Sequence, residues 1–424
     1  MKNKKTILYL RTDFSYSDLI AGGSVAHTLG VIQGFINHKW QLIVASTVME
    51  KQLSPLAIKK LHVLSVPKKM LWLGWKLTSF ITSVIFLKQA HALIKFNAVT
   101  FIYQRYSILN CTGVLLSYLN HIPLILEYNG SEVWVDKRWS SQKKFITFRW
   151  LIYLVESLNI HFAHSIIVVS QPLKDDLIER GADPKKILVN PNGVNTMILN
   201  PILLENDRIM IRNKLAIANK FVFGFIGTFG KWHGIEMLVA MIPSIVQQKS
   251  QAHFLLIGDG PLFSYAQQAL QDYIRAGQVS FTGIIEQHEA KKYLAACDAF
   301  LSPTLPNQDG TPFFGSPTKL FEYLSMGKPI IASELNQVAE IVYPSLKITD
   351  KNIVITNQIG ITITPGNIQE FIRAGIALIE IEKSERDKMG SNARIKAIEK
   401  YDWNHHVQKI IESIKNNDKI RNVL

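Results

Sequence analysis

Lys319 and Glu322 are the two residues of this chain whose types and spacing point most directly to chemistry. They lie in DGTPFFGSPTKLFEYLSMGKPIIAS (309–333), where a loop rich in glycine and proline leads into a predicted helix and a buried strand. Residues three positions apart share a helix face. An amine that neutralises phosphate therefore lies beside a carboxylate that accepts hydrogen bonds from hydroxyls, and the pair predicts a site for a sugar nucleotide.

The predicted helix has to begin at the loop for this site to form. Ser316 is a suitable N-cap and Pro317 suits the first helical position, where a missing N–H costs nothing. The free N–H groups and positive dipole end of such a helix favour an anion such as phosphate. The alternative is a structural crossover in which Lys319 and Glu322 form an exposed ion pair worth about 0.3–0.5 kcal/mol.

Two other loops have the composition of phosphate sites. Gly22 and Gly23 follow the first predicted strand and precede a helical run, so they permit close approach of the backbone to a phosphate. The block FVFGFIGTFGKWHGIEML (221–238) places Lys231 and His233 between a strand and a helix that begins near Gly234. Cationic side chains beside a helix start again favour a phosphate group.

Taken in order, these blocks resemble the retaining GT-B glycosyltransferases (glycosyl transferases group 1, family 4-like). The run G-x-P-x-K-L-x-E-Y at 315–323 is similar to the donor-binding motif of that family. HFLLIGDGP (253–261) and the segment 279–304 match further family blocks, and the P-N-G-V-N turn at 191–195 resembles the landmark that ends the first domain.

The resemblance implies roles for individual residues on the donor side. It implies catalytic roles for Lys231, His233, Lys319 and Glu322. It implies donor-binding roles for Gly22, Gly23, Thr228, Ile284, Asp309, Gly310, Thr311, Phe313 and Phe314.

The chain departs from the family pattern in the residues that are expected to bind the donor diphosphate. Thr228 occupies the usual arginine position and His233 the usual lysine position. Lys231 is expected to supply the missing charge, with His233 donating a hydrogen bond; a surface loop with a solvated Lys231 is the alternative. A histidine at this place is expected to make donor affinity more sensitive to pH than a lysine would.

Sugar recognition also departs from the pattern. Phe314 stands where many relatives carry a glutamate near the sugar, and its side chain accepts no hydrogen bond. Asp309 and the amides of Gly310, Thr311, Phe313 and Phe314 are the nearest candidates to replace it.

On the acceptor side, LEYNGSEVW (126–134) is similar to the family loop that faces the acceptor. Asn129 stands where numerous relatives carry a histidine; it hydrogen-bonds a sugar hydroxyl but takes no proton. Glu132 is a candidate substitute, with a helix-capping role as the alternative. Arg105, at the end of another predicted strand, is placed to bind an acceptor phosphate.

The fold class follows from repeated alternation of apolar runs and helical segments. The runs are TILYL, QLIVAS, VTFIYQ, PLILEY and SIIVVS, then FVFGFIG, HFLLIG, VSFTG, AFLSP and PIIAS. Continuous hydrophobicity indicates parallel strands covered on both faces, so an α/β protein with two doubly wound sheets is expected. The resemblance implies the GT-B arrangement, two Rossmann-like domains facing a central cleft: an acceptor-binding domain at 1–200, a nucleotide-sugar domain at 201–400, and a C-terminal helix and tail at 401–424 that cross back to the first domain.

The boundary is expected near 189–201, followed by a linker without clear periodicity. The segment YDWNHHVQKIIESI (401–414) predicts an amphipathic helix with Trp403, Val407 and Ile410 on one face.

Positive charge is concentrated in the first half of the chain. Residues 1–200 contain 23 Lys or Arg against 11 Asp or Glu, whereas residues 201–424 contain 24 against 22. From 51 to 126 there is no acidic residue, and nine basic residues alternate with aromatic ones. This mixture favours an anionic lipid surface. No nucleic-acid-binding motif accompanies it, so nucleic acid is not expected as a partner.

The run LWLGWKLTSFITSVIFL (71–87) is apolar but interrupted by Lys76 and several hydroxyls. Three alternatives stay open: a helix lying in the membrane interface, which is favoured, a helix buried against its domain, and a membrane span. A second basic and aromatic stretch at 143–155 extends the same surface.

The two cysteines indicate neither a disulfide framework nor a zinc site, and no signal peptide is recognised. A cytoplasmic protein at the inner membrane face is expected, with no metal and no cofactor beyond a nucleoside diphosphate sugar co-substrate. The hypothesis is a metal-independent retaining glycosyltransferase that acts on a carbohydrate or lipid-linked acceptor in cell-surface polysaccharide or glycolipid synthesis. The alternatives are a non-catalytic membrane-surface or scaffold protein with a degenerate site, and an epimerase or phosphorylase on the same scaffold.

Overall fold

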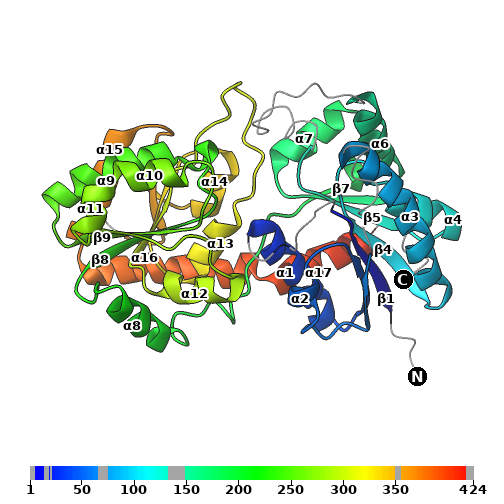
Figure 1. Cartoon of the computed structure of the whole chain (residues 1–424), viewed down its shortest axis with the longest axis horizontal. Helices are drawn as coiled ribbons and strands as arrows, with labels where there is room; N and C mark the ends of the chain where they lie inside the picture. Colours follow the sequence, from blue (N-terminus) through cyan, green and yellow to red (C-terminus); the bar gives the residue numbers. More distant parts are fainter. Residues whose placement is uncertain are drawn as a thin grey trace. The chain divides into compact units, whose positions relative to one another are not determined.

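The computed structural model describes residues 5–13, 19, 22–64, 75–131, 149–348 and 355–416, and its elements are labelled in Figure 1. The chain divides into two compact units. The first comprises Thr28–Pro191 together with the described residues before position 20 and those from Trp403 onward. The second comprises Asn192–Asp402 together with residues 22–27.

The first unit is built on a parallel sheet in which the strand order is β3-β2-β1-β4-β5-β6-β7. Its strands are β1 (Thr6–Arg11), β2 (Gln41–Ser46), β3 (Lys60–Val63), β4 (Val99–Arg105), β5 (Leu124–Tyr128), β6 (Ser165–Val168) and β7 (Ile187–Val189). Its helices are α1 (Gly23–Asn37), α2 (Glu50–Leu53), α3 (Trp75–Lys95), α4 (Thr112–Asn120), α6 (Arg149–Phe162), α7 (Gln171–Glu179) and α17 (Trp403–Lys415), with the 3₁₀ turn Pro184–Lys186. The first residues of α1 group with the second unit.

The second unit repeats this plan with the order β10-β9-β8-β11-β12-β14-β13. Its strands are β8 (Phe221–Ile226), β9 (Ala252–Ile257), β10 (Val279–Phe281), β11 (Ala299–Ser302), β12 (Ile330–Ser333), β13 (Leu346–Lys347) and β14 (Gly360–Ile363). Its helices are α8 (Glu205–Lys214), α9 (Ile235–Gln248), α10 (Phe263–Ala269), α11 (Gln271–Arg275), α12 (Gln287–Ala295), α13 (Thr318–Ser325), α14 (Asn336–Val342), α15 (Ile368–Glu380) and α16 (Lys383–Lys396), with the short turns Lys231–His233 and Ala397–Tyr401. The expected class, two doubly wound parallel sheets, is confirmed.

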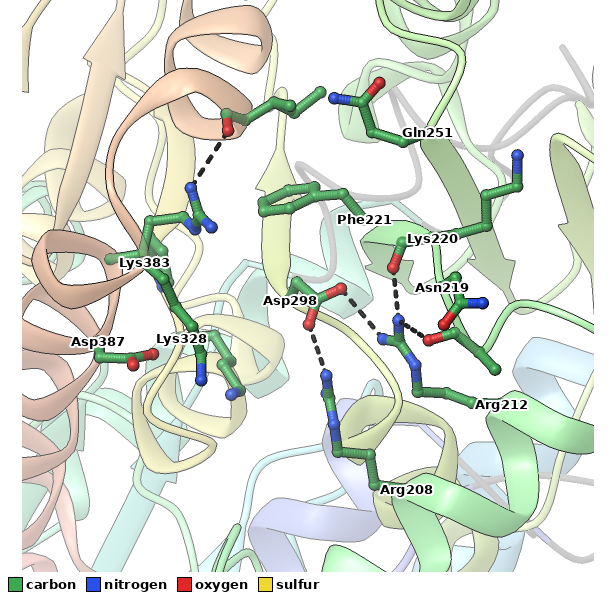
Figure 2. Close-up of a pocket in the computed structure, with 14 residues that line it drawn as sticks. Arg208, Arg212, Asn219, Lys220, Phe221, Gln251, Asp298, Lys328, Lys383 and Asp387 are labelled. Carbon is green, nitrogen blue, oxygen red and sulfur yellow. Dashed lines mark hydrogen bonds and ion pairs between the residues drawn. The ribbon is translucent and has the colours of Figure 1, made fainter.

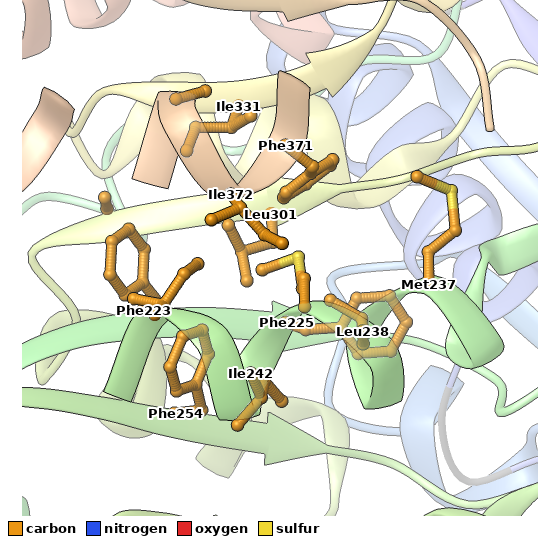
Figure 3. Close-up of a cluster of buried hydrophobic side chains, with 14 of the residues drawn as sticks. Phe223, Phe225, Met237, Leu238, Ile242, Phe254, Leu301, Ile331, Phe371 and Ile372 are labelled. Atoms are coloured by element: carbon orange, nitrogen blue, oxygen red, sulfur yellow. The ribbon is translucent and has the colours of Figure 1, made fainter. Parts of the chain in front are cut away.

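The second sheet is covered on both faces, which explains its continuous apolar strands. Side chains alternate between faces along a strand, and Phe223 and Phe225 of β8 enter one hydrophobic cluster whereas Val222 enters another. Figure 3 shows the first cluster, in which α9 and α15 pack against the phenylalanines of β8 and β9. All ten predicted strands are present in the two sheets.

The C-terminal helix α17 packs against α1 of the first unit through two glycines. A Cβ built on Gly30 would lie 2.1 Å from the Trp403 ring, and one on Gly34 would lie 2.5 Å from a methyl group of Val407. The predicted apolar face of the segment is buried. The fold class therefore includes the expected return of the C-terminal helix to the first unit.

Helix α3 begins inside the apolar run 71–87, of which residues 71–74 lie outside the described residues. Ser83 of α3 contacts the start of α4: its carbonyl accepts from the Thr112 hydroxyl at 3.0 Å, and its hydroxyl accepts from the Cys111 amide at 3.1 Å. Because Phe86 is buried as well, this part of the helix packs within its unit. No helix among the described residues has the length and apolar character that crossing a bilayer requires.

The segment after the boundary is more regular than expected. Helix α8 occupies most of the predicted linker, with Ile211 and Arg212 buried. Its many polar residues hide the apolar spacing, since Arg212 takes an inward position by donating to the carbonyls of Ala296 and Ala218.

Candidate functional site

Helix α13 brings the Lys319–Glu322 pair to the carboxyl edge of the second sheet. Every residue from Lys319 to Ser325 is buried, so the alternative of an exposed ion pair is wrong. The hydroxyl of Tyr323 accepts a hydrogen bond of 2.9 Å from the Ile226 amide at the end of β8, and its ring stacks on Phe300. These contacts fix α13 beside the end of β8 and the loop that follows it.

The start of α13 differs from the expectation by one residue. Pro317 is the N-cap and the helix begins at Thr318, and Ser316 makes no capping bond. Ser316 is instead engaged by Asn192: its hydroxyl accepts from the Asn192 amide at 3.1 Å, and its carbonyl accepts from the Asn192 side chain at 2.6 Å. His27 donates through Nδ1 to the Asn192 side-chain oxygen at 2.5 Å. Asn192 of the P-N-G-V-N turn thus connects the loop before α13 with His27 of α1.

The Lys319 amine and the His233 ring approach each other beside Gly227. The Lys319 ammonium lies 3.2 Å from Nδ1 of His233 and 4.3 Å from the centre of the Phe225 ring. Because a charged amine only donates, Nδ1 accepts and the ring carries its proton on Nε2. A Cβ on Gly227 would lie 3.8 Å from both His233 Nε2 and Lys319 Nζ. Two nitrogen donors therefore face the space that the missing side chain leaves.

Burial shifts the pKa values of this group toward neutrality. Loss of water lowers the pKa of Lys319 to about 7 and raises the pKa of Glu322 to about 7. Burial, together with the charge of Lys319, lowers the pKa of His233 well below its usual value. Lys319 and Glu322 are therefore the groups of this site whose pKa values lie near neutral pH, and the pH sensitivity expected from His233 stays a prediction.

Gln287 connects Glu322 with the loop that contains Gly22 and Gly23. The sequence analysis did not predict a role for this glutamine. The Gln287 side chain donates to Glu322 at 3.4 Å and accepts from the Gly22 amide at 3.2 Å. Gly23 lies against Thr318, since a Cβ there would be 2.7 Å from its hydroxyl. The structure thus brings together Gly22, Gly23 and the first turn of α13.

The loop before α13 uses its polar groups internally. The Thr311 amide and hydroxyl donate to the Asp309 carboxylate, the Gly310 amide donates to the Asn307 carbonyl, and the Phe313 amide donates to the Asn336 side chain. Phe313 is buried and Phe314 half-buried. The amides of Gly310, Thr311 and Phe313 thus have acceptors within the protein, and their role as substitutes for the missing glutamate stays a prediction.

Three further donor-side candidates are exposed. They are Thr228, Lys231 and Ile284. Lys231 and His233 share a 3₁₀ turn. Lys231 is exposed, whereas Lys319 Nζ lies 3.8 Å from a Cβ built on Gly227, so the charge next to Gly227 comes from Lys319. Ile284 follows Gly283, which adopts a positive φ of 67°.

The acceptor-side candidates of the first unit meet at Glu127. Arg105 is ion-paired to this buried carboxylate, and Asn129 donates to the same oxygen at 2.6 Å. Burial lowers the pKa of Arg105, but the adjacent Glu127 charge raises it above its usual value. Arg105 thus has a counter-ion within the protein. Glu132 lies outside the described residues.

No group of three or more His, Cys, Asp or Glu side chains is arranged to hold a metal ion in the part of the chain that the structure describes. The positive charge around Gly227 comes from protein nitrogens.

Two family profiles match the chain. The family described as Glycosyl transferases group 1 matches residues 220–380, and Glycosyltransferase Family 4 matches residues 21–197. Among curated relatives, sulfoquinovosyl transferase SQD2 of Arabidopsis thaliana is 23% identical over 70% of this chain and 50% of that protein. The amylovoran biosynthesis glycosyltransferase AmsK of Erwinia amylovora is 24% identical over 42% of this chain and 41% of that protein. The chain thus spans about half or less of the length of these relatives.

Solved structures match over nearly the whole chain. Alr3699/HepE of Anabaena, crystallised with UDP-glucose, aligns with a TM-score of 0.67 at 20% identity and covers 97% of this chain and 99% of that one. This likeness shows the fold. Together with the two profiles, it places the chain in the group 1 and family 4 glycosyltransferases of GT-B fold.

Proposed function

We propose that this protein is a retaining glycosyltransferase that moves a sugar from a nucleoside diphosphate sugar to a carbohydrate or lipid-linked acceptor. The observation that carries the proposal is the convergence of Lys319 Nζ and His233 Nε2 above Gly227. Two donors at the carboxyl edge of a parallel sheet, beside the start of a helix, suit a diphosphate.

The comparisons support the choice of substrates. A structural neighbour holds UDP-glucose, and a relative is named for amylovoran biosynthesis. We assign this chain to the synthesis of a cell-surface polysaccharide or glycolipid on that basis.

The reaction breaks the bond between the anomeric carbon and the diphosphate and forms a bond from the acceptor oxygen to the same carbon. The acceptor proton passes to the departing phosphate oxygen. Negative charge grows on the diphosphate as its bond breaks, so donors fixed by Lys319 and His233 stabilise the transition state more than the bound substrate. These side chains take the place of a metal ion, in keeping with the lack of an Asp-x-Asp run.

Glu322 binds the ribose of the donor in this scheme. Its carboxylate accepts hydrogen bonds from the two ribose hydroxyls, which restores the solvation that burial removed. Gln287 keeps the carboxylate oriented through its bond to Oε1. Direct contact with a ligand favours the ionised form, so donor binding lowers the pKa of Glu322.

The proposal is tested by calorimetric titration with UDP-, ADP- and GDP-hexoses, followed by assays of nucleotide release with and without a chelator. We expect one nucleotide sugar to bind, and Lys319→Gln to weaken that binding. Lys388→Gln serves as the control because Lys388 is exposed on α16. Release that persists with the chelator supports the metal-independent reaction.

The outcomes separate the alternatives. Absence of binding for every nucleotide sugar contradicts the proposal. Binding without turnover on any acceptor supports the non-catalytic scaffold, and conversion of the donor sugar without transfer supports an epimerase. The anomeric configuration of the product, read by NMR, decides between retention and inversion.

We also propose that the first unit contacts an anionic membrane surface at the inner face of the membrane. Its support is the excess of basic residues before position 200 and the absence of acidic residues from 51 to 126. Flotation with vesicles of phosphatidylglycerol tests this, with phosphatidylcholine vesicles as the control. Equal binding to both, or to neither, contradicts it.

A further inference from the structure

A concave site lies at the edge of the second sheet where the strands begin. It is a pocket of about 450 Å³ that includes Phe221 at the start of β8, Asp298 just before β11 and Pro329 just before β12. Lys319 and His233 lie near the carboxyl ends of the same strands. The pocket is therefore separate from the candidate donor site.

The pocket lining is strongly basic. Its basic residues are Arg208, Arg212, Lys220, Lys328, Lys383 and Arg386, against the acidic residues Asp298 and Asp387. Figure 2 shows Lys328, Lys383 and Asp387 on one side and Arg208, Arg212 and Asp298 on the other. Six positive charges around one concavity, opposed by two negative ones, give a positive potential that attracts anions.

Four of these cations have structural partners, and one of them, the Lys220 amine, donates to the Ser250 carbonyl at 3.0 Å. Arg208 and Arg212 share the Asp298 carboxylate at 2.6 and 3.0 Å and donate further to backbone carbonyls. Arg386 donates to the carbonyls of Leu378 and Ile379 and lies over the Phe221 ring. These side chains are held rigidly, so the walls of the pocket are preorganised.

Lys328 and Lys383 differ from the arginines because no described residue accepts a hydrogen bond from either amine. Lys328 is half-buried, and burial together with the charge of Arg208 lowers its pKa. Lys383 is the exposed first residue of α16. Two amines without acceptors thus face a concavity whose other cations are already fixed. An anion placed there would meet two amines that can donate charge-assisted hydrogen bonds.

We propose that this pocket binds the phosphate group of a small phosphorylated molecule or of a lipid headgroup, with Lys328 and Lys383 as its ligands. The volume is within the range of small-molecule sites and exceeds what a bare phosphate fills. Pro329 and Ile379 provide apolar wall for the remainder of the ligand. The inference does not depend on the identity of the donor sugar.

The test uses the full-length chain carrying Lys319→Gln, so that the candidate donor site does not contribute. Glucose 6-phosphate and a soluble short-chain phosphatidic acid are each titrated by calorimetry, with short-chain phosphatidylcholine as the control, so that binding of the first unit to an anionic membrane surface does not contribute. We expect one of the two phosphate sources to bind. Lys328→Gln should weaken that binding at least tenfold, and Lys383→Gln should weaken it to a smaller extent.

Lys388→Gln is the matched control, since Lys388 lies on the same helix as Lys383 and does not line the pocket. Its affinity should equal that of the parent. Thermal unfolding of each variant shows whether it is folded, and Lys383→Gln alone decides the question if Lys328→Gln is not. Failure of both phosphate sources to bind, or equal affinity in the pocket variants and the control, overturns the proposal.

Discussion

Two buried groups of charged side chains differ in how their charge is balanced. In the first unit, Arg105 and Glu127 neutralise each other, and Asn129 donates to the same carboxylate. In the second unit, Lys319 and Glu322 are also buried, yet their pKa values move toward 7 because loss of water is the main influence on each. In the first group the two charges are paired with each other, whereas the lysine and the glutamate of the second group form no ion pair with any described residue.

The two groups are therefore expected to have different roles, one in stability and the other in ligand binding. A buried ion pair that loses one partner leaves an uncompensated charge, so its members are expected to matter for stability. A buried amine without a counter-ion costs stability and is typical of functional sites. Substitutions in the first group should therefore change stability, and substitutions in the second should change ligand binding.

The largest effect is expected for Lys319→Gln. Removing a cation that stabilises a leaving diphosphate should lower kcat/KM for the nucleotide sugar by about 100-fold or more, which corresponds to roughly 3 kcal/mol. The melting temperature should not fall, because the variant no longer buries an amine. Steady-state kinetics and thermal unfolding of the variant and of Lys388→Gln check this. A loss of stability with unchanged kinetics would place Lys319 with the structural group.

Glu127→Gln should have the opposite signature. Arg105 stays charged and loses its counter-ion, so the free energy of unfolding should drop by roughly 3 kcal/mol. Chemical denaturation measures this change.

Glu322→Gln is the matched variant for that measurement. The folded-state pKa of Glu322 is raised to about 7 from 4.5, so its contribution to stability is present below pH 4.5 and lost as pH rises through 7. At pH 8 the variant should be at least as stable as the parent. Equal destabilisation by the two substitutions would remove the distinction between the groups.

Donor affinity should depend on pH through Lys319. Its pKa is about 7 in the free protein, and a bound diphosphate raises it, so binding takes up a proton. Affinity for UDP-glucose should fall as pH rises above 7, by up to about tenfold per pH unit. Titrations between about pH 6 and pH 9 should show this dependence in the parent and in His233→Gln, and not in Lys319→Gln. Its disappearance in His233→Gln alone would restore the histidine as the titrating group.

The sequence predicted the sheets better than it predicted the site. Continuous apolar runs identified ten strands, because strands buried on both faces need them. It missed β3, β7, β13 and β14. Strands β3 and β13 contain exposed residues, so no continuous apolar run marks them. Glycine at the first position of β14 reads as a turn, although a Cβ there would lie 2.1 Å from the Ile330 carbonyl.

At the site, local motifs identified Lys319, Glu322 and His233 but not the bonds that orient them. Gln287 and Asn192 act on residues 35 and 124 positions away, respectively, and spacing along the chain carries no signal for such pairs. The state of charge was also beyond the sequence. Whether a lysine is solvated or desolvated depends on packing. Lys231 is exposed and Lys319 is buried, although both lie near the loop that follows β8.

The smallest effect is expected for Lys231→Gln, which sharpens the comparison within the second unit. Lys231 is exposed, whereas Lys319 is buried beside His233. Water screens an exposed amine, and such charges contribute about 0–1 kcal/mol. The variant should therefore retain kcat/KM for the nucleotide sugar within about fivefold, with the pH dependence of the parent. A loss as large as that of Lys319→Gln would mean that Lys231 reaches the diphosphate when the donor binds, and that the buried amine is not the main cation of the site.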